Sequence, residues 1–427
     1  MATAAALASA NAVVWFQKRS IVHPFAIMSL CFFVPLLAAG ARLSGLQEAS
    51  WAYETHVVIL EAVIVWGAFL LVGSLATSSR AHGQNEQRPR QEIGRPKSSF
   101  YWSARLMAIL HIFAVLLQNY VSSGLLITLM DPELAYQYHT KTVPVLQVFT
   151  RVGFAASALL YLSYYYKRRT LDAVLLLLVI LVPLTRLARL DLFLSGATLL
   201  ILYLHVPVFP LRPRTLLTGL ALMVALAYGL VEVGNQRTSR FGKYVISYSN
   251  AIRFRAPAGP GDALAVWYGY FPLSFENFDR FVRRNPSYRT YGLLSAAPLL
   301  NSFVPTNRLT KGGYPGSEVI VDRRDPVGSM ATVGTALSAF YLDFGAAWAW
   351  IPMLVYAAFW ISLYRLRERS PAWLAAYCSF SAAMALASFQ EVMTVPFLYQ
   401  GLVLVTIPLI LWFPSWSSNP SEDGLDG

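Results

Sequence analysis

Residues 55–77 read THVVILEAVIVWGAFLLVGSLAT, an almost uninterrupted apolar run. Such a run, folded as an α-helix, can cross the ~30 Å hydrocarbon core of a bilayer, which takes about 20 residues. Similar runs recur along the chain, whereas a membrane β-barrel would need short segments of alternating hydrophobicity. The sequence therefore predicts an all-α fold built from membrane-spanning helices.

The composition of the chain is typical of the same class of protein. Hydrophobic residues make up 56% of the chain and charged residues only 13%, against about 25% charged residues in soluble domains. Cys31 and Cys378 both fall within apolar runs, so we expect packing residues and no disulfide or metal ligand. The N-terminus lacks the residue order of a cleavable signal peptide, so the first span is expected to remain as an anchor.

We expect an all-α polytopic integral membrane protein with about 10–12 transmembrane helices. The clearest spans are 23–41, 55–77, 101–122, 143–166, 170–185, 190–209, 215–233, 345–364, 372–390 and 396–413. They divide the chain into an N-terminal bundle (1–233) with a polar cytoplasmic loop (78–100), a large external loop (234–329), C-terminal helices (330–413) and a cytoplasmic tail (414–427). Whether the apolar segment 330–343 crosses the membrane or only enters it stays open.

The distribution of Lys and Arg sets the orientation. Alternating the spans across the membrane puts five basic clusters on one side, at residues 18–19, 80–105, 167–169, 212–214 and 365–369. Short loops rich in Lys and Arg stay in the cytoplasm. Both termini are therefore expected in the cytoplasm, and the loop 234–329 is expected outside.

The external loop is unusually basic. Residues 235–329 carry 13 Lys and Arg against 6 Asp and Glu, a net charge of +7 out of +12 for the whole chain. The positive-inside rule does not apply to loops of this length, so the charge needs another explanation. We interpret the loop as a binding and reaction surface for an anionic substrate.

Arg186 and Arg189 lie at the outer end of the span 170–185, on a turn too short to leave the membrane surface. Two guanidinium groups one helical turn apart are suited to bidentate binding of a phosphodiester or a pyrophosphate. The alternative is that they reach toward water or pair with Asp191. Within the loop only a few of six further arginines are expected to touch a ligand: Arg253, Arg255, Arg280, Arg283, Arg284 and Arg289.

Residues 263–284 read ALAVWYGYFPLSFENFDRFVRR, an amphipathic and aromatic segment broken at Pro272. We expect an interfacial element with its charged residues Glu276, Asp279 and Arg280 toward an aqueous cavity. The aromatic residues are expected against lipid, where they either form an interfacial belt or stack on sugar faces. They are Trp267, Tyr268, Tyr270, Phe271, Phe275, Phe278 and Phe281.

Metal chemistry has little support in the sequence. The six His residues are scattered and no two have ligand spacing. A Walker-type phosphate loop is also missing from the sequence. We therefore expect no metal and no cofactor, and a substrate that carries its own activated phosphate.

Residues 330–345 read MATVGTALSAFYLDFG. A Thr eight residues before an Asp-Phe-Gly, with aromatic residues just before the Asp, resembles the bacterial O-antigen polymerases, the Wzy-type oligosaccharide repeat-unit polymerases. The matching residues are Thr335, Phe340, Tyr341, Asp343, Phe344 and Gly345, and the family's frequent Asn and Pro are replaced by Thr332 and Ala339. The stretches YFPLSF at 270–275 and YGL at 291–293 resemble two further segments of the family.

The resemblance implies a GT-C-like fold in the bacterial inner membrane, with an active site that faces the periplasm. The activity implied is a polymerase reaction, in which a growing glycan moves from undecaprenyl pyrophosphate to the non-reducing end of the next lipid-linked repeat unit. The implied partners are the undecaprenyl-pyrophosphate-linked oligosaccharide, membrane lipid and a chain-length regulator protein, with no nucleic acid.

Such a reaction needs few chemical groups from the protein. Pyrophosphate is a good leaving group, so arginines would stabilise its charge and one carboxylate would act as general base. The candidates for the base are Asp279, Glu276 and Asp343, in that order, with helix capping as the alternative role of Asp343. The substrate-binding candidates are Arg186, Arg189, Arg253, Arg255, Arg280, Arg284, Arg289, Tyr270 and Thr335.

Two other functions remain open. A ligase that transfers finished O-antigen to lipid A core would have a similar layout and differ in its acceptor. A polysaccharide or lipid transporter without chemistry would be expected to show internal repeats and polar residues near the midplane. No repeat between the two halves of the chain is evident in the sequence.

Overall fold

The computed structural model describes the chain in ten main segments and a few isolated positions. The segments are 2–18, 22–48, 50–77, 98–123, 152–186, 189–208, 252–255, 263–284, 289–292 and 335–388. Within them the chain is mostly helical, and the β-pairing is one isolated bridge between Ser44 and Phe254. The expected all-α class is confirmed for these residues. The predicted spans 215–233 and 396–413 and the tail 414–427 lie outside them.

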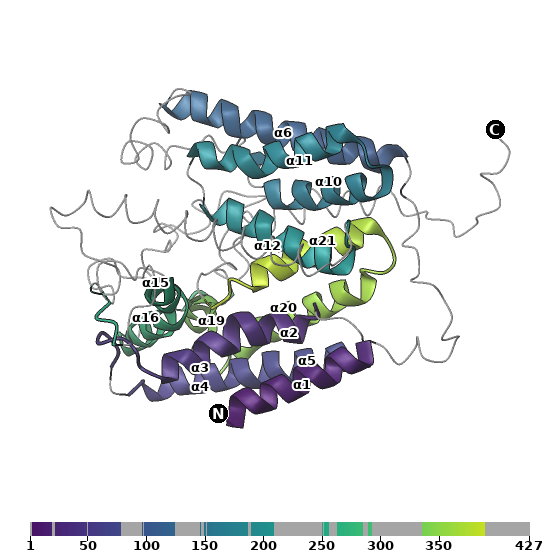
Figure 1. Cartoon of the computed structure of the whole chain (residues 1–427). Helices are drawn as coiled ribbons and strands as arrows, with labels where there is room; N and C mark the ends of the chain where they lie inside the picture. The colour runs from purple at the N-terminus through teal and green to yellow at the C-terminus, as the bar shows by residue number, and fades with distance from the viewer. Residues whose placement is uncertain are drawn as a thin grey trace, which may run out of the picture.

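Three helical rods form the side of the bundle that carries the N-terminus in Figure 1. They are α1 (Ala2–Lys18), the rod α2–η1–α3 (Pro24–Met28, Ser29–Phe33, Val34–Gly40) and the rod α4–η2–α5 (Tyr53–Ala62, Val63–Phe69, Leu70–Ala76). The last two match the predicted spans 23–41 and 55–77. Residues 2–18 lie before the first predicted span and form a helix that packs on α5, with Val14 fully buried.

Four further helices form the opposite side of the bundle (Figure 1). They are α6 (Ser98–Ser123), α10 (Gly153–Lys167), α11 (Thr170–Leu181) with the short helix η3 (Val182–Arg186), and α12 (Arg189–His205). A buried ion pair and a hydrogen bond join three of them: Arg105 Nε lies 2.6 Å from Asp172 Oδ1, and Ser163 Oγ donates to Asp172 Oδ2 at 2.7 Å. These three residues come from α6, α11 and α10 respectively.

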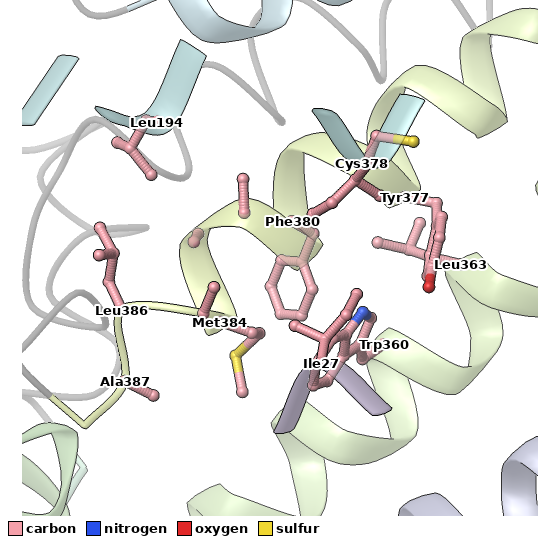
Figure 2. Packing of buried hydrophobic residues seen from close by; sticks show 14 of the residues in the cluster. Ile27, Leu194, Trp360, Leu363, Tyr377, Cys378, Phe380, Met384, Leu386 and Ala387 are labelled. Carbon is pink, nitrogen blue, oxygen red and sulfur yellow. The ribbon is translucent and has the colours of Figure 1, made fainter. Parts of the chain in front are cut away.

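The two sides meet on α20 (Trp350–Leu366) and α21 (Pro371–Met384). Pro371 opens α21, and the Ser370 side chain caps it by accepting from Trp373 N at 3.3 Å. Figure 2 shows the apolar packing here, where Phe380 and Trp360 lie close to Ile27 of α2, and Leu194 of α12 belongs to the same buried cluster. Trp360 Nε1 donates to Ser381 Oγ at 2.8 Å, so the polar end of this buried ring is satisfied.

Three shorter helices gather at one end of the bundle, which we call the α16 end (Figure 1). They are α15 (Ala263–Tyr270), α16 (Pro272–Arg283) and α19 (Ala336–Phe344). The turns between α10 and α11 and between α20 and α21, which carry basic clusters, lie at the opposite end. Because α19 has nine residues, its ~14 Å length is less than half of a bilayer core.

The outer surface of the bundle is apolar along α6. Trp102, Leu106, Ile109 and Phe113 form a stripe at helical spacing, and each is between 53% and 70% exposed. Two helices, Tyr53–Ala76 and Ser98–Val121, are long and apolar enough to cross a membrane by length and composition. These properties are compatible with a membrane protein.

Candidate functional site

Helix α16 is held at its end of the bundle by an aromatic face. Pro272 starts the helix at a position where its missing N–H costs nothing, and Arg280 and Arg283 in the last turn interact favourably with the helix dipole. The rings of Phe275, Phe278 and Phe281 are buried, and Phe275 packs edge-on against Phe32 at 5.3 Å. The prediction that these rings face lipid is wrong, because α3, α4, α15 and α19 pack on α16 and the rings are buried.

The acidic face of α16 is also covered, by the loop between α3 and α4 (the α3–α4 loop, residues 41–52). Glu276 is fully buried, and its two oxygens accept from Glu48 N at 2.8 Å and from Trp51 Nε1 at 3.0 Å. Burial raises the pKa of the Glu276 carboxyl, and the two N–H groups partly offset this by favouring the ionised form. The prediction of an aqueous cavity around Glu276 is therefore wrong, because the carboxylate contacts backbone and indole N–H groups.

Asp279, one turn further along α16, binds the same loop. Its Oδ1 accepts from Ala52 N and from Thr55 Oγ1, both at 2.7 Å, and its Oδ2 accepts from Arg283 Nε at 2.6 Å. Asp279 is fully buried. We call Glu276, Asp279 and their donors the carboxylate clamp, because together they fasten the α3–α4 loop to α16.

Asp343 holds a second connection, between α19 and residues 289–292. Thr290 Oγ1 donates to Asp343 Oδ1 at 2.5 Å, and the backbone N–H of Tyr291 donates to the Asp343 carbonyl at 3.0 Å. Asp343 is fully buried and lies at the C-terminal end of α19. It does not cap the N-terminus of the following helix, since α20 begins at Trp350.

The segment 289–292 and the C-terminal end of α19 pack closely at two glycines. A Cβ on Gly292 would lie 3.2 Å from the Phe344 ring, and a Cβ on Gly345 would lie 3.2 Å from Arg289 Nε. Gly345 has φ +71° and ψ −177°, a backbone conformation that only glycine adopts readily. Tyr291 and Gly292 of the YGL stretch are thus in direct contact with the Asp-Phe-Gly motif.

Gly345→Ala is expected to lower the free energy of unfolding by about 1–3 kcal/mol, the usual cost of a residue forced into this backbone region. The added methyl group would also displace the Arg289 guanidinium. Thermal unfolding in detergent measures the effect. Gly196→Ala in α12 is the matched control, because a Cβ there meets no atom within 4 Å. Equal melting temperatures for the two variants would contradict this account.

A partly exposed cluster lies beside these connections. Tyr341 is fully buried and its hydroxyl donates to Glu54 Oε2, while the Arg289 guanidinium lies 5.1 Å from the centre of the Tyr341 ring. Burial raises the pKa of Tyr341 to about 12, with the hydrogen bond to Glu54 adding to the shift, so the phenol stays protonated. Glu54 and Arg289 are both half-buried and thus reach the surface.

Glu54 was not among the residues nominated from the sequence. It is an isolated acidic residue in the first turn of α4, a position where a carboxylate is favoured by the helix dipole in any protein. Its partner Tyr341 is 287 residues away. The only sequence signal was that Glu54 opens a predicted span at its external end.

Four other arginines of the long loop that the sequence analysis names as substrate-binding candidates lie at the C-terminal end of α16 and on the segment 252–255. Arg280 donates to the Leu46 carbonyl at 3.1 Å and thus helps to hold the α3–α4 loop, whereas Arg284 is exposed at the end of α16. Arg253 and Arg255 are exposed on a segment whose backbone pairs with Leu43 and Gly45. The structure brings these four to the same end of the bundle as Arg289.

The remaining nominated residues are Arg186, Arg189, Tyr270 and Thr335. Arg186 ends η3 and Arg189 begins α12, and nothing is described of their side chains. Figure 1 places the start of α12 toward the α16 end of the bundle. Tyr270 is half-buried against a small apolar cluster around Tyr268. Thr335 is fully buried at the start of α19, and its hydroxyl has no hydrogen-bond partner among the described residues.

The described part of the chain contains no group of His, Cys, Asp and Glu residues that could hold a metal ion. Comparison with known proteins does not identify a family: no family model, no curated protein and no solved structure matches the chain. The arrangement at the α16 end is therefore the basis for any functional assignment.

Proposed function

We propose that the protein is a membrane glycosyltransferase that polymerises lipid-linked oligosaccharide repeat units. The observation that carries this proposal is the group of charged side chains at the α16 end. Arg283 has a side chain that is 43% exposed, and Arg289 and Glu54 are half-buried. Each is held by a buried partner: Arg283 by Asp279, and both Arg289 and Glu54 by Tyr341.

The apolar surface of the bundle supports a lipid-linked substrate. In water, the exposed stripe of Trp102, Leu106, Ile109 and Phe113 would be unfavourable, and it is expected to face lipid tails. A polyprenyl chain would then stay in the bilayer while its charged headgroup reaches the end of the bundle. In a bacterium the proposal puts the protein in the inner membrane, with the α16 end facing the periplasm.

The arginines suit a pyrophosphate leaving group. When the bond between a sugar and a pyrophosphate breaks, negative charge accumulates on the phosphate oxygen, and a fixed guanidinium group stabilises that charge. Arg289 cannot easily move away from this position, because Gly345 and the Tyr341 ring border it. Arg283 lies on the neighbouring helix α16 and adds a second positive charge.

The test is a polymerisation assay with purified protein in detergent. The substrate is the pool of polyprenyl-pyrophosphate-linked oligosaccharides extracted from a strain in which the gene is deleted. Wild-type protein is expected to give a ladder of glycans. Arg289→Ala is expected to lower the rate about 100-fold, as for loss of one group that stabilises transition-state charge, and Arg289→Lys less.

Arg365→Ala is the matched control, because Arg365 is an exposed arginine near the turn at the opposite end of the bundle. It removes the same charge and is expected to leave the rate unchanged. A product formed only when lipid A core is added would assign the protein as a ligase. No glycan product with either acceptor would overturn the transferase proposal.

A further inference from the structure

The three carboxylates that the sequence offers as a general base are buried and hydrogen-bonded to groups of the protein. Glu276 and Asp279 are fully buried within the carboxylate clamp, and Asp343 is fully buried against Thr290. A general base must come within hydrogen-bond distance of the hydroxyl that it deprotonates. A carboxylate without exposed surface, already bonded to protein donors, does not meet this condition without disrupting the loop that it holds.

Glu54 is in a different situation. Its Oε2 accepts from the Tyr341 hydroxyl, and its Oε1 has no hydrogen bond to any part of the chain that the structure describes. The side chain is half-buried, so it is fixed on one oxygen and accessible on the other. Its neighbour Thr55 is bonded to Asp279, which fastens the start of α4 at this point.

The surroundings of Glu54 carry the opposite charge. The Arg289 guanidinium lies 5.1 Å from the centre of the Tyr341 ring, and Arg283 bonds to Asp279, the acceptor of Thr55. Tyr341 therefore contacts both a carboxylate and a guanidinium group. A reaction that takes a proton from one substrate and places charge on the leaving group of another needs these two groups side by side.

We propose that Glu54 is the general base of the transfer reaction and that the acceptor sugar binds with its reacting hydroxyl on Glu54 Oε1. This inference rests on the proposed function. As the hydroxyl oxygen forms a bond to the anomeric carbon of the donor, its proton passes to Glu54. The bond between that carbon and the phosphate oxygen breaks, and the electron pair leaves with the polyprenyl pyrophosphate, next to Arg289. The proton on Glu54 then returns to water.

Tyr341 is a positioning residue in this scheme. Its buried hydroxyl fixes the rotamer of Glu54 and leaves Oε1 as the oxygen that faces the substrate. Tyr341→Phe is therefore expected to lower the turnover number less than replacement of Glu54 itself. A structural role of Glu54, as an acidic residue in the first turn of α4, predicts instead that stability changes and turnover does not.

The experiment uses the full-length protein and the extracted lipid-linked oligosaccharides, with the rate measured over a range of substrate concentrations. Glu54→Gln is expected to lower the turnover number about 100-fold or more, the usual contribution of a general base, with the KM for the donor changed less than threefold. Arg289→Ala is expected to raise that KM as well. Formate added to Glu54→Ala is expected to restore part of the rate, because a small carboxylate can occupy the space of the missing one.

Glu368→Gln is the matched control, since Glu368 is a glutamate with a side chain that is 61% exposed, near the turn between α20 and α21 at the end of the bundle opposite the α16 end. Its rate is expected to equal that of wild type. A wild-type ladder together with a Glu54→Gln rate within threefold of wild type would overturn the assignment of Glu54 and leave the proposed function standing. Absence of any ladder from wild-type protein would overturn both. Thermal unfolding of each variant identifies a rate loss that comes from misfolding, and the formate rescue then decides the role of Glu54.

Discussion

Asp172→Ala is expected to lower the free energy of unfolding by about 3–5 kcal/mol, the cost of leaving a buried charge without its partner. Asp172 is fully buried, and Arg105, whose side chain is 7% exposed, has no other carboxylate within reach among the described residues. One guanidinium nitrogen of Arg105 already has no hydrogen-bond partner there. Removal of Asp172 would leave the whole guanidinium group in an apolar environment.

A double variant separates the cost of the lone charge from the value of the pair. Arg105→Met combined with Asp172→Leu replaces the ion pair by apolar side chains and is expected to be within about 1 kcal/mol of wild type or more stable. Thermal and denaturant unfolding in detergent measure both variants. If Asp172→Ala proved no less stable than the double variant, the ion pair between α6 and α11 would not have the role described.

Asp279→Ala is expected to lower the free energy of unfolding by about 3 kcal/mol, because hydrogen bonds to a charged group contribute about 1.5–3 kcal/mol each. Two of its donors, Ala52 N and Thr55 Oγ1, belong to the start of α4, and the third is the partly exposed Arg283, which water can solvate. The loss is therefore expected to concentrate in the α3–α4 loop. Limited proteolysis within residues 41–52 measures it directly.

Asp279→Asn tests which of the hydrogen bonds to Asp279 require a carboxylate. Its amide oxygen can still accept from Ala52 N and Thr55 Oγ1, whereas its amide nitrogen would face the Arg283 donor. An intermediate loss of stability is expected, with the loop still resistant to protease. Cleavage of the loop at the wild-type rate in Asp279→Ala would show that other contacts hold it.

Much of the bundle could be predicted from the sequence, because apolar length is a local property. The runs at 55–77 and 101–122 needed only the width of a bilayer to be interpreted as helices, and both are helices in the structure. The helix α1 was missed because its Ala-rich sequence has weak amphipathicity and no span length. The break at Pro272 was predicted correctly from the fixed dihedral angle of proline.

The candidate site could be predicted only in part. The sequence nominated Glu276, Asp279 and Arg289, which the structure brings to one end of the bundle. It did not show that the α3–α4 loop covers Glu276 and Asp279, because amphipathicity indicates a polar face but not what contacts that face. Glu54 was missed for a related reason: its importance depends on Tyr341, and no local pattern links residues 287 positions apart.

The carboxylate clamp also sets an order of events during synthesis of the chain. The donors in the α3–α4 loop and at the start of α4 are made 224 to 228 residues before the acceptors Glu276 and Asp279. At the usual rate of about 5–20 residues per second, the ribosome needs roughly 10 to 45 s to cover that interval. During that time the indole N–H of Trp51 and the hydroxyl of Thr55 lack the acceptors that they bond in the folded protein. The α16 end is therefore the part of the protein completed late in biogenesis, after the helices α4, α6 and α10 to α12 have emerged.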